Sequence, residues 1–556
     1  MGSYKENGEA IFFVAREGAA LPLYEFDFNN LTFILTFIIG GTLITMFIRK
    51  SIRKNFSRLI SAIFLSSALS LATVSANTAE SVTGIHIPVF YDTLSNGLRV
   101  LIVPDTNVAV VSCRLYYFVG GMDEWSSATG LSHMYEHMLF KGTKRLGTRD
   151  YQKEVPYLNS IDSLDRLLQS VREAKGESDP RYKAFFDEIM SLLDKQRQYM
   201  KKDEIWELYN NNGGSALNAW TSDNMTGYIV TLPKNRVELF YWIESDRMQN
   251  TVLREFHSER EVVTEERRMR YDNRPVNRYW ERLNSLFYVA HPYRQPVIGW
   301  ESDIRAFTTE KLKDHVHRFY TPDNAILILV GNIDRKKAMA DIELYFGGIK
   351  RADYKRREVV TREPAAFGGT RFTVAEDVEP RVDVLFQTPG YPNADLYSLD
   401  VVEGILSDRS GRLYKRLVDK EQLCTDAGAS NNVRLHNGYF HVYASLKKEA
   451  DPARVEAVIK EELNKLVKEA PSDKEMARVV NGMRMSFATG LKSLEGLSDR
   501  LASFERLGSW KDIYDYQEKV VSVKAASIPE AVGKYLKPEL ATWGFIVPKT
   551  ATKRNN

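Results

Sequence analysis

The sequence predicts an α+β protein made of two similar halves that follow an N-terminal leader. At 556 residues the chain is too long for one ordinary hydrophobic core. Strand patterns at residues 98–103 and 108–119 precede a predicted helix, and a second strand–helix–strand succession begins at Thr370. The formal net charge of +3 is small for a chain of this length, so the composition gives no indication of nucleic-acid binding.

The first 80 residues form the predicted leader. Residues 31–48 are an uncharged apolar run at the lower length limit of a membrane span. Basic residues follow this run, and a second apolar run at 59–74 leads into a small-x-small pattern that is typical of signal-peptide cleavage sites. Residues 46–76 therefore have the features of a complete secretory signal.

Two starting points of translation are open. If the chain starts at Met46, residues 1–45 are an upstream extension and a signal peptide at 46–76 is removed. If it starts at Met1, residues 31–48 and the second apolar run can anchor the chain in a membrane as a hairpin. Both alternatives place the rest of the chain in the periplasm or another extracytoplasmic compartment.

The strongest chemical motif is His-x-x-Glu-His at residues 133–137. His133 and His137 are four residues apart, so on a helix they project from one face. Two imidazoles at this spacing can bind one zinc ion, which prefers tetrahedral nitrogen and oxygen donors and needs at least one more ligand. Glu136 is too close in sequence to bind comfortably beside both histidines, but it can take a proton from a water molecule that the metal activates. The alternative is a pair of solvated histidines beside a surface glutamate.

Residues 150–205 are predicted to form an inserted, charged helical hairpin. Apolar residues repeat at helical spacing on both sides of a Gly-Glu-Ser-Asp-Pro turn at 176–180. We expect this segment to pack as an arm on the surface of the first half. A gate or a partner-docking element is the alternative.

A second helix offers the missing ligand. Residues 258–266 carry several glutamates, and Glu259 and Glu266 share one face two turns long. A carboxylate from this helix would complete a His2Glu site with one position open for water, and a second glutamate would orient a ligand histidine. The spacing alone does not choose among Glu259, Glu261, Glu265 and Glu266.

Five separated segments match one known family in chain order. They are residues 130–143, 218–221, 259–266, 291–293 and 319–332. On these segments the chain resembles the pitrilysin/insulinase family of inverted-motif zinc peptidases, in its short-chain, processing-peptidase-like bacterial branch. The resemblance covers residues ~90–350 closely and 370–548 loosely.

This resemblance implies roles for the candidate residues. It makes His133, His137 and Glu266 the ligands of one zinc ion per chain. Glu136 is then the general base, and Glu259 is the acid that supports a ligand. The separation between the second histidine and the third ligand is larger than is usual in the family, and the predicted arm accounts for the excess.

The resemblance also implies a substrate-binding edge strand and an overall fold. Asn218 and Ala219 match the edge strand, which would pair with an extended peptide through backbone hydrogen bonds. The alternative is that Asn218 merely ends a strand. The implied fold consists of two homologous αβ half-domains, each an antiparallel-rich sheet packed with helices, which together form one half of a clamshell.

The second half repeats the plan of the first without the metal ligands. The predicted organisation is a zinc-bearing domain at 85–350, a polar linker at 351–368 and a C-terminal homologous domain at 369–548. Active members of the family resemble Leu-Arg-x-x-x-x-Leu-x-Tyr in this half, and the Arg and Tyr contact substrate near the metal. Here Val418 and Thr425 occupy those positions, and neither can donate a charged or phenolic hydrogen bond to a carbonyl oxygen.

Two assemblies are compatible with this difference. In the favoured one, a separate homologous chain without the zinc motif supplies the Arg and Tyr as the other subunit of a heterodimer. In the other, the chain is a poorly active homodimer. The expected function is that of an exported zinc endopeptidase acting on peptides or unfolded polypeptides, and the alternative is a non-catalytic binding or assembly subunit that retains the fold.

Overall fold

The structure is a computed structural model of the whole chain. It describes residues 23–27, 32–39, 42–48, 87–353 and 355–549. By its internal contacts the chain divides into two compact units, Met1–Gly84 and Ile85–Asn556. The two units are described separately below.

The described part of the first unit is a three-stranded antiparallel sheet. Its strands are β1 (Leu23–Asp27), β2 (Thr32–Ile39) and β3 (Thr42–Ile48). The apolar run at 31–48 is therefore divided between two paired strands. The remainder of the predicted signal segment, residues 49–76, lies outside the described residues. Within the described ranges, no helix combines the length and the apolar character that a membrane span requires.

The first half of the second unit contains a six-stranded sheet in the order β4-β5-β9-β6-β8-β7. Only β5 and β9 are parallel neighbours, and the other pairs are antiparallel. Because both faces of this sheet are covered, the central strand β9 is buried along its whole apolar length. The strands are β4 (Phe90–Thr93), β5 (Arg99–Pro104), β6 (Val110–Tyr117), β7 (Ser215–Thr221), β8 (Thr226–Pro233) and β9 (Ala325–Gly331).

The second half contains a five-stranded sheet in the order β10-β14-β11-β13-β12. Its strands are β10 (Thr370–Ala375), β11 (Arg381–Thr388), β12 (Cys424–Asn432), β13 (Gly438–Leu446) and β14 (Thr542–Val547). If β4 is set aside, the five remaining strands of the first sheet have the same spatial order as the five strands of the second sheet. Each of these five-stranded arrangements contains one parallel pair, β5–β9 in the first and β10–β14 in the second. The predicted fold of two similar α+β halves is confirmed.

Helices cover one face of each sheet and form the two largest cores. In the first half these are α2 (Leu131–Met138), α6 (Val237–Asn250), α10 (Thr309–Phe319) and α11 (Arg335–Phe346). In the second half they are α12 (Asp395–Leu406), α14 (Pro452–Lys468), α15 (Asp473–Gly490), α17 (Asp512–Val521) and α18 (Ser527–Tyr535). Shorter or peripheral helices are α5 (Glu204–Asn211), α7 (Phe256–Arg267), α9 (Glu301–Arg305) and α13 (Arg412–Tyr414).

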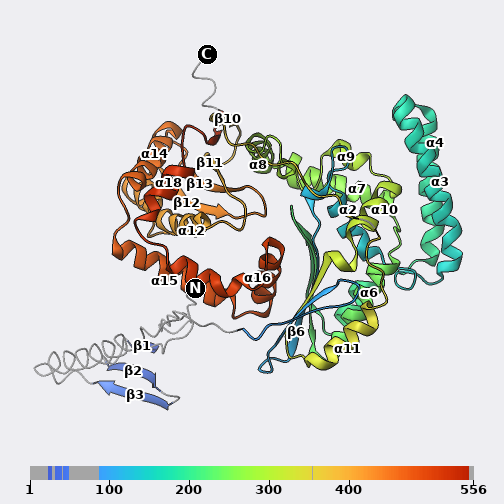
Figure 1. Ribbon diagram of the computed structural model, residues 1–556, viewed down its shortest axis with the longest axis horizontal. Helices are drawn as coiled ribbons and strands as arrows, with labels where there is room; N and C mark the ends of the chain where they lie inside the picture. The colour runs from blue at the N-terminus through green and yellow to red at the C-terminus, as the bar shows by residue number, and fades with distance from the viewer. Residues whose placement is uncertain (1–22, 28–31, 40–41, 49–86, 354, 550–556) are drawn as a thin grey trace, which may run out of the picture. The chain divides into compact units, whose positions relative to one another are not determined.

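The two halves exchange one helix each. Helix α8 (Pro275–Phe287) belongs to the first half but packs on the second sheet, where the Tyr279 hydroxyl donates to Asp383 Oδ2 over 2.8 Å. Helix α16 (Leu494–Leu507) belongs to the second half but packs on the first sheet with its buried Leu501 and Ala502. Figure 1 shows α16 close to the first sheet and α8 close to the second. This exchange fixes the orientation of the two halves, because each helix buries its apolar face against the other half.

The inserted arm is a helical hairpin made of α3 (Tyr151–Lys175) and α4 (Pro180–Gln196). The two helices lie side by side at the outer edge of the first half (Figure 1). They share a small core of their own, formed by Ile161, Leu168, Ile189 and Leu193. The predicted insertion of a helical hairpin is confirmed.

The segment that joins the halves has no helix or strand in its described residues, 351–353 and 355–368. It is nevertheless fixed to the first half through Glu363, whose carboxylate accepts hydrogen bonds from the backbone N–H groups of Val289, Ala290 and His291. The connection is therefore anchored near the end of α8.

Candidate metal site

Two helices of the first half bring three potential metal ligands together. Helix α2 carries His133 and His137, and α7 carries Glu266. One donor atom from each residue lies within 4.8 Å of the other two. Glu266 Oε2 is 3.3 Å from Nε2 of His137 and 3.8 Å from Nε2 of His133. Among the residues that the structure describes, this is the only group of three or more His, Cys, Asp or Glu side chains with such spacing.

The donor set fits a zinc ion. Tetrahedral zinc with bonds of ~2.0–2.2 Å places neighbouring donor atoms roughly 3–3.5 Å apart, and the two Glu266 distances are close to this range. Burial lowers the pKa of His133 to about 4, so its imidazole is neutral and keeps the lone pair that binds a metal. Its Nδ1 is buried and has no hydrogen-bond partner among the described residues.

The second histidine lies in a strongly negative environment. Burial alone would lower the pKa of His137, but hydrogen bonds to Glu259 and Glu266 raise it to about 9. Burial alone would likewise raise the pKa of Glu266, and its hydrogen bond to His137 lowers it instead. This environment stabilises positive charge between the two helices, which is what the binding of a divalent cation requires.

The first turn of α2 is fixed by a buried carboxylate. Glu124 accepts hydrogen bonds from the backbone N–H groups of Gly130, over 2.5 Å, and of Ser132, over 2.7 Å. These N–H groups have no partner within the helix, and a carboxylate also complements the positive end of the helix dipole. Gly130 has a φ of 94°, and a Cβ there would lie 2.5 Å from the carbonyl oxygen of Ile298. The chain can therefore enter this helix only through glycine at that position.

Glu136 lies on the same helix and is held by the neighbouring strand. The Thr221 hydroxyl, at the end of β7, donates a hydrogen bond to Glu136 Oε2 over 2.7 Å. Burial raises the pKa of Glu136, and this hydrogen bond opposes the increase. A buried carboxylate with a raised pKa is suited to accept and return a proton.

Glu259 supports the second histidine from the other side. Its Oε2 lies 3.4 Å from Nδ1 of His137, while its Oε1 pairs with the Lys141 ammonium. Burial alone would raise the pKa of Glu259, but hydrogen bonds to His137 and Lys141 lower it. The carboxylate is thus placed to fix the orientation of the imidazole.

The structure distinguishes among the four glutamates that the sequence offers as candidates for the third metal ligand. Glu265 pairs with Arg268 at the protein surface, and the Glu261 side chain is half exposed on another face of α7. Only Glu259 and Glu266 of this set face α2. Their separation of seven residues, two helical turns, places both on that face.

Asn218 and Ala219 lie on β7, the last strand of the six-stranded sheet. They pair with Ile229 and Tyr228 of β8, which leaves the other edge of β7 without a strand neighbour in the described sheet. Asn218 is exposed, and this edge leads directly to Thr221 beside Glu136. An extended peptide that pairs with this edge would run toward the metal site.

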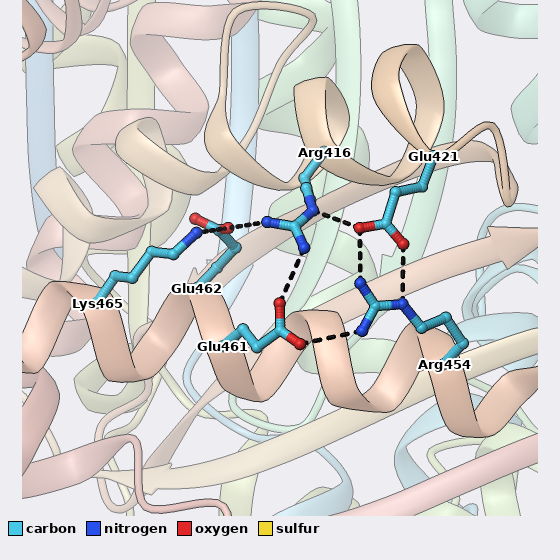
Figure 2. A network of polar contacts seen from close by, with 6 residues as sticks. All are labelled: Arg416, Glu421, Arg454, Glu461, Glu462 and Lys465. Atoms are coloured by element: carbon cyan, nitrogen blue, oxygen red, sulfur yellow. Dashed lines mark hydrogen bonds and ion pairs between the residues drawn. The ribbon is translucent and has the colours of Figure 1, made fainter.

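Three polar side chains of the second half that lie at or near Val418 and Thr425 in sequence have partners within that half. The nearby Arg416 is held in a network of ion pairs with Glu421, Glu461 and Glu462 (Figure 2). Arg412 is likewise held by a bidentate ion pair with Glu475. The Thr425 hydroxyl donates to Glu379 over 2.8 Å. These side chains are therefore engaged within the second half.

The sequence prediction gives no role to several residues that the structure places at the site. Thr221 occurs in the matched segment 218–221, so its position was visible but its hydrogen bond to Glu136 was not. Lys141 follows His137 by four residues, a spacing that predicts the same helix face for both side chains. Arg270 pairs with Glu266 over 2.8 Å, and its position four residues after Glu266 is the sequence signal for this ion pair. Glu124 carries no such signal, because its contacts depend on how the surrounding segments pack.

Family comparisons agree with the two-half organisation. Residues 99–161, which include the His-x-x-Glu-His motif, match the model described as Insulinase (Peptidase family M16). Residues 306–483 match the model described as Peptidase M16 inactive domain. The metal ligands and Glu136 all lie outside this second match.

Individual relatives cover nearly the whole folded part. The chain is 26% identical over 496 residues to "Zinc protease PqqE" of Helicobacter pylori, which covers 87% of this chain and 98% of the relative. It superimposes on the crystal structure of a protease from Helicobacter pylori with a TM-score of 0.70 and 25% identity, covering 83% of this chain and all of the other. The fold also matches the first half of the periplasmic protease PqqL from Escherichia coli with a TM-score of 0.63 and 18% identity. This match covers 84% of this chain and 93% of the other.

These matches agree with the geometry of the two sheets and with the position of the inverted motif on α2. The zinc protease PqqE and the Helicobacter protease structure extend over both halves, so the similarity is not confined to one motif. The chain therefore belongs to the pitrilysin/insulinase family, peptidase family M16.

Proposed function

We propose that this protein is a zinc-dependent endopeptidase that hydrolyses peptides or unfolded polypeptides. The observation that carries the proposal is the arrangement of His133, His137 and Glu266 as a three-donor group with Glu136 beside it. Relatives named zinc proteases support the same reaction class. A His2Glu donor set leaves a fourth position open, which is typical of catalytic rather than structural zinc sites.

Individual residues of the chain have distinct roles in the proposed reaction. A zinc ion, when bound, would supply Lewis-acid activation of water and of the peptide carbonyl. Glu136 accepts a proton from the attacking water and returns it to the departing amine nitrogen. Thr221 holds Oε2 of Glu136 in place, and burial keeps the pKa of this carboxyl above its usual value, so that the proton can be both accepted and released.

The substrate would bind as an added strand along β7. The outer edge of β7, the strand that carries Asn218 and Ala219, has no strand neighbour in the described sheet, and backbone pairing gives affinity without demanding a particular sequence. Extended or unfolded segments can present such a strand, whereas a folded domain has its strands already paired. Unfolded polypeptides and peptides are therefore the expected substrate class.

A second chain would complete the site. Val418 and Thr425 cannot give the oxyanion a charged or phenolic hydrogen bond, and losing one such donor costs about 2.7–4 kcal/mol of transition-state stabilisation. The arginines near these positions are held in ion pairs within the second half (Figure 2). We favour a homologous subunit that supplies the missing Arg and Tyr in a heterodimer, with a weakly active homodimer as the alternative.

Export of the protein is part of the proposal. It rests on the secretory pattern at residues 46–76, with anchoring through residues 31–48 if translation starts at Met1. Fractionation of cells that express the full chain tests it. The folded part should appear in the periplasmic or other extracytoplasmic fraction, and recovery in the cytosol alone would contradict export.

The reaction is tested with Glu136→Gln. The wild-type protein should cleave an unfolded protein such as reduced casein, a chelator should stop the cleavage, and added zinc should restore it. Glu136→Gln should lose at least about a hundredfold in kcat while it binds zinc with wild-type stoichiometry. Hydrolysis that survives in this variant, or that resists chelation, would contradict the proposal.

The same assay separates the enzyme from a non-catalytic subunit. A binding or assembly subunit would show no chelator-sensitive hydrolysis, either alone or with its homologous partner. The heterodimer predicts that adding a homologous chain that carries the Arg and Tyr raises kcat. A homodimer instead predicts that activity depends on the concentration of this chain alone and does not change when the second chain is added.

A further inference from the structure

A groove with two arginines lies beside the metal site. It is formed by the π-helical turn Arg268–Asp272, by the start of α8 and by the loop between β10 and β11. Its volume is about 600 Å³. The residues that line it are Met269, Arg270, Arg274, Val276, Asn277 and Val378, together with Pro275.

Arg270 connects this groove to the metal site. Its Nη1 donates to Oε1 of Glu266 over 2.8 Å, while Oε2 of the same carboxylate faces the two histidines. The Arg270 side chain is 70% exposed. One guanidinium nitrogen thus contacts a candidate ligand, and the rest of the group is directed to solvent and the groove.

Arg274 lies one turn further along the chain at the start of α8. It is exposed, and its side chain has no ion pair or hydrogen-bond partner among the described residues. Asn277, in the same groove, uses its side-chain amide to donate to the backbone carbonyl of Arg270 over 2.6 Å. This bond fixes the backbone from which Arg270 projects.

The arginines that flank the groove differ from Arg274, because each has an acidic partner, as Arg270 has in Glu266. Arg267 pairs with Glu281, Arg268 pairs with Glu265, and Arg278 pairs with Glu376. No acidic residue lines the groove itself. Arg274 therefore gives the groove an unpaired positive charge, and Arg270 adds a guanidinium group of which only one nitrogen contacts Glu266.

We propose that this groove binds a carboxylate of the substrate close to the bond that is cleaved. The proposal deepens the proposed peptidase function and rests on it. Arginine guanidinium groups bind carboxylates through paired, charge-assisted hydrogen bonds. The half-buried Pro275 and Val276, with exposed Met269, form an apolar wall for the aliphatic part of a side chain.

The carboxylate can come from an aspartate or glutamate side chain or from the C-terminus of a peptide. A side-chain source makes the protein an endopeptidase that prefers acidic residues near the scissile bond. A C-terminal source makes it prefer bonds near the end of the substrate. Both sources present the same chemistry to Arg270 and Arg274.

The test uses fluorogenic peptides in which one glutamate is moved through the positions flanking the cleaved bond, each paired with a glutamine version. A second set compares free and amidated C-termini. Dissociation constants are measured by fluorescence anisotropy with the zinc-loaded Glu136→Gln variant, which should bind without cleaving. KM is measured in parallel with the active protein.

In at least one set, the carboxylate peptide should have a dissociation constant about threefold to tenfold lower than that of its neutral counterpart. The expected ratio is small because a partly exposed ion pair contributes only modestly to affinity. Arg270→Gln and Arg274→Gln should each reduce this ratio toward one. Arg282→Gln, an exposed arginine on α8 outside the groove, is the matched control and should retain the ratio. High salt should weaken the preference.

The outcomes separate the two proposals. A binding preference that depends on Arg274, found without any hydrolysis, supports the groove and contradicts the peptidase. If the protein hydrolyses peptides but binds glutamate and glutamine peptides equally, and binds free and amidated C-termini equally, the proposed role of the groove is wrong. The proposed peptidase function would still stand. An equal loss in all peptides for Arg274→Gln also overturns the proposed role of the groove, because that result shows a structural role only.

Discussion

The hydroxyl of Thr221 donates a hydrogen bond to Oε2 of Glu136 over 2.7 Å. This contact joins β7, the strand proposed to bind substrate, to α2, the helix with the two histidines. The proposed base is therefore oriented by the element that would align the peptide. We infer that Thr221 is a positioning residue, because it acts on the reaction through Glu136.

Thr221→Val, which removes the hydroxyl and keeps the shape, should lower kcat about tenfold to a hundredfold with little change in KM. Thr221→Ser keeps the donor and should restore most of kcat. Steady-state kinetics on one peptide substrate checks both variants, with zinc content as a control for the metal site. An equally low kcat in the serine variant would show that the methyl group matters and the hydrogen bond does not.

Glu259→Gln should weaken zinc binding about tenfold to a hundredfold, since the carboxylate that orients the His137 imidazole is lost. Competition with a zinc-binding dye measures this affinity. The matched control is Glu265→Gln, a surface residue on the same helix that pairs with Arg268. Equal affinities in the two variants would exclude the supporting role of Glu259.

The arm is anchored by a fully buried ion pair. Arg254 Nε donates to Glu154 Oε1 over 2.7 Å, and the same guanidinium donates to the backbone carbonyls of Lys141, Thr143 and Leu146, just after α2. Removing one partner of such a pair leaves a buried charge and costs about 3–5 kcal/mol.

Arg254→Met should therefore lower the melting temperature by several degrees and make the segment after α2 more susceptible to proteolysis. Differential scanning fluorimetry and limited proteolysis measure the two effects. Arg181→Ala, which removes an exposed ion pair at the start of α4, should leave both unchanged. If the two variants behave alike, the arm is not coupled to the segment that follows α2.

Stability should depend on pH through two carboxylates of α12. Burial raises the pKa of Asp400 to about 6 and of Glu403 to about 7, although Asn431 donates hydrogen bonds to both. Because the folded chain holds these protons more tightly than the unfolded chain, their contribution is complete below about pH 4 and is lost as pH rises to about 7.

The double variant Asp400→Asn, Glu403→Gln keeps the acceptor oxygens and removes the titration. Its melting temperature should therefore fall less than that of the wild-type protein between pH 5 and pH 8, by the equivalent of roughly 4 kcal/mol. Thermal unfolding at several pH values measures the difference. Parallel curves for the two proteins would contradict the assignment.

Much of the fold follows from patterns that are local in sequence. The strands predicted at 98–103 and 108–119 overlap β5 and β6, because their apolar residues form short strand patterns. The exchange of α8 and α16 between the halves could not be predicted in this way. An apolar helix face indicates burial, but it does not identify the sheet that the face will cover.

The candidate site, like the fold, could be predicted only in part from the sequence. The spacing of His133 and His137 predicts a shared face, since both lie on one helix. The choice of Glu266 over Glu265 depends on the rotation of α7 against α2, which no spacing within α7 reveals. Arg270 lies four residues after Glu266, the usual spacing of an ion pair along a helix, so this contact could have been predicted once Glu266 was chosen.

The metal site itself is tested most directly by anomalous X-ray scattering at the zinc edge from crystals of the zinc-loaded protein. We predict one peak per chain, about 2.0–2.2 Å from Nε2 of His133, Nε2 of His137 and a carboxylate oxygen of Glu266. A peak at another position, or zinc bound to the histidines with both Glu266 oxygens more than about 3 Å away, would contradict the account.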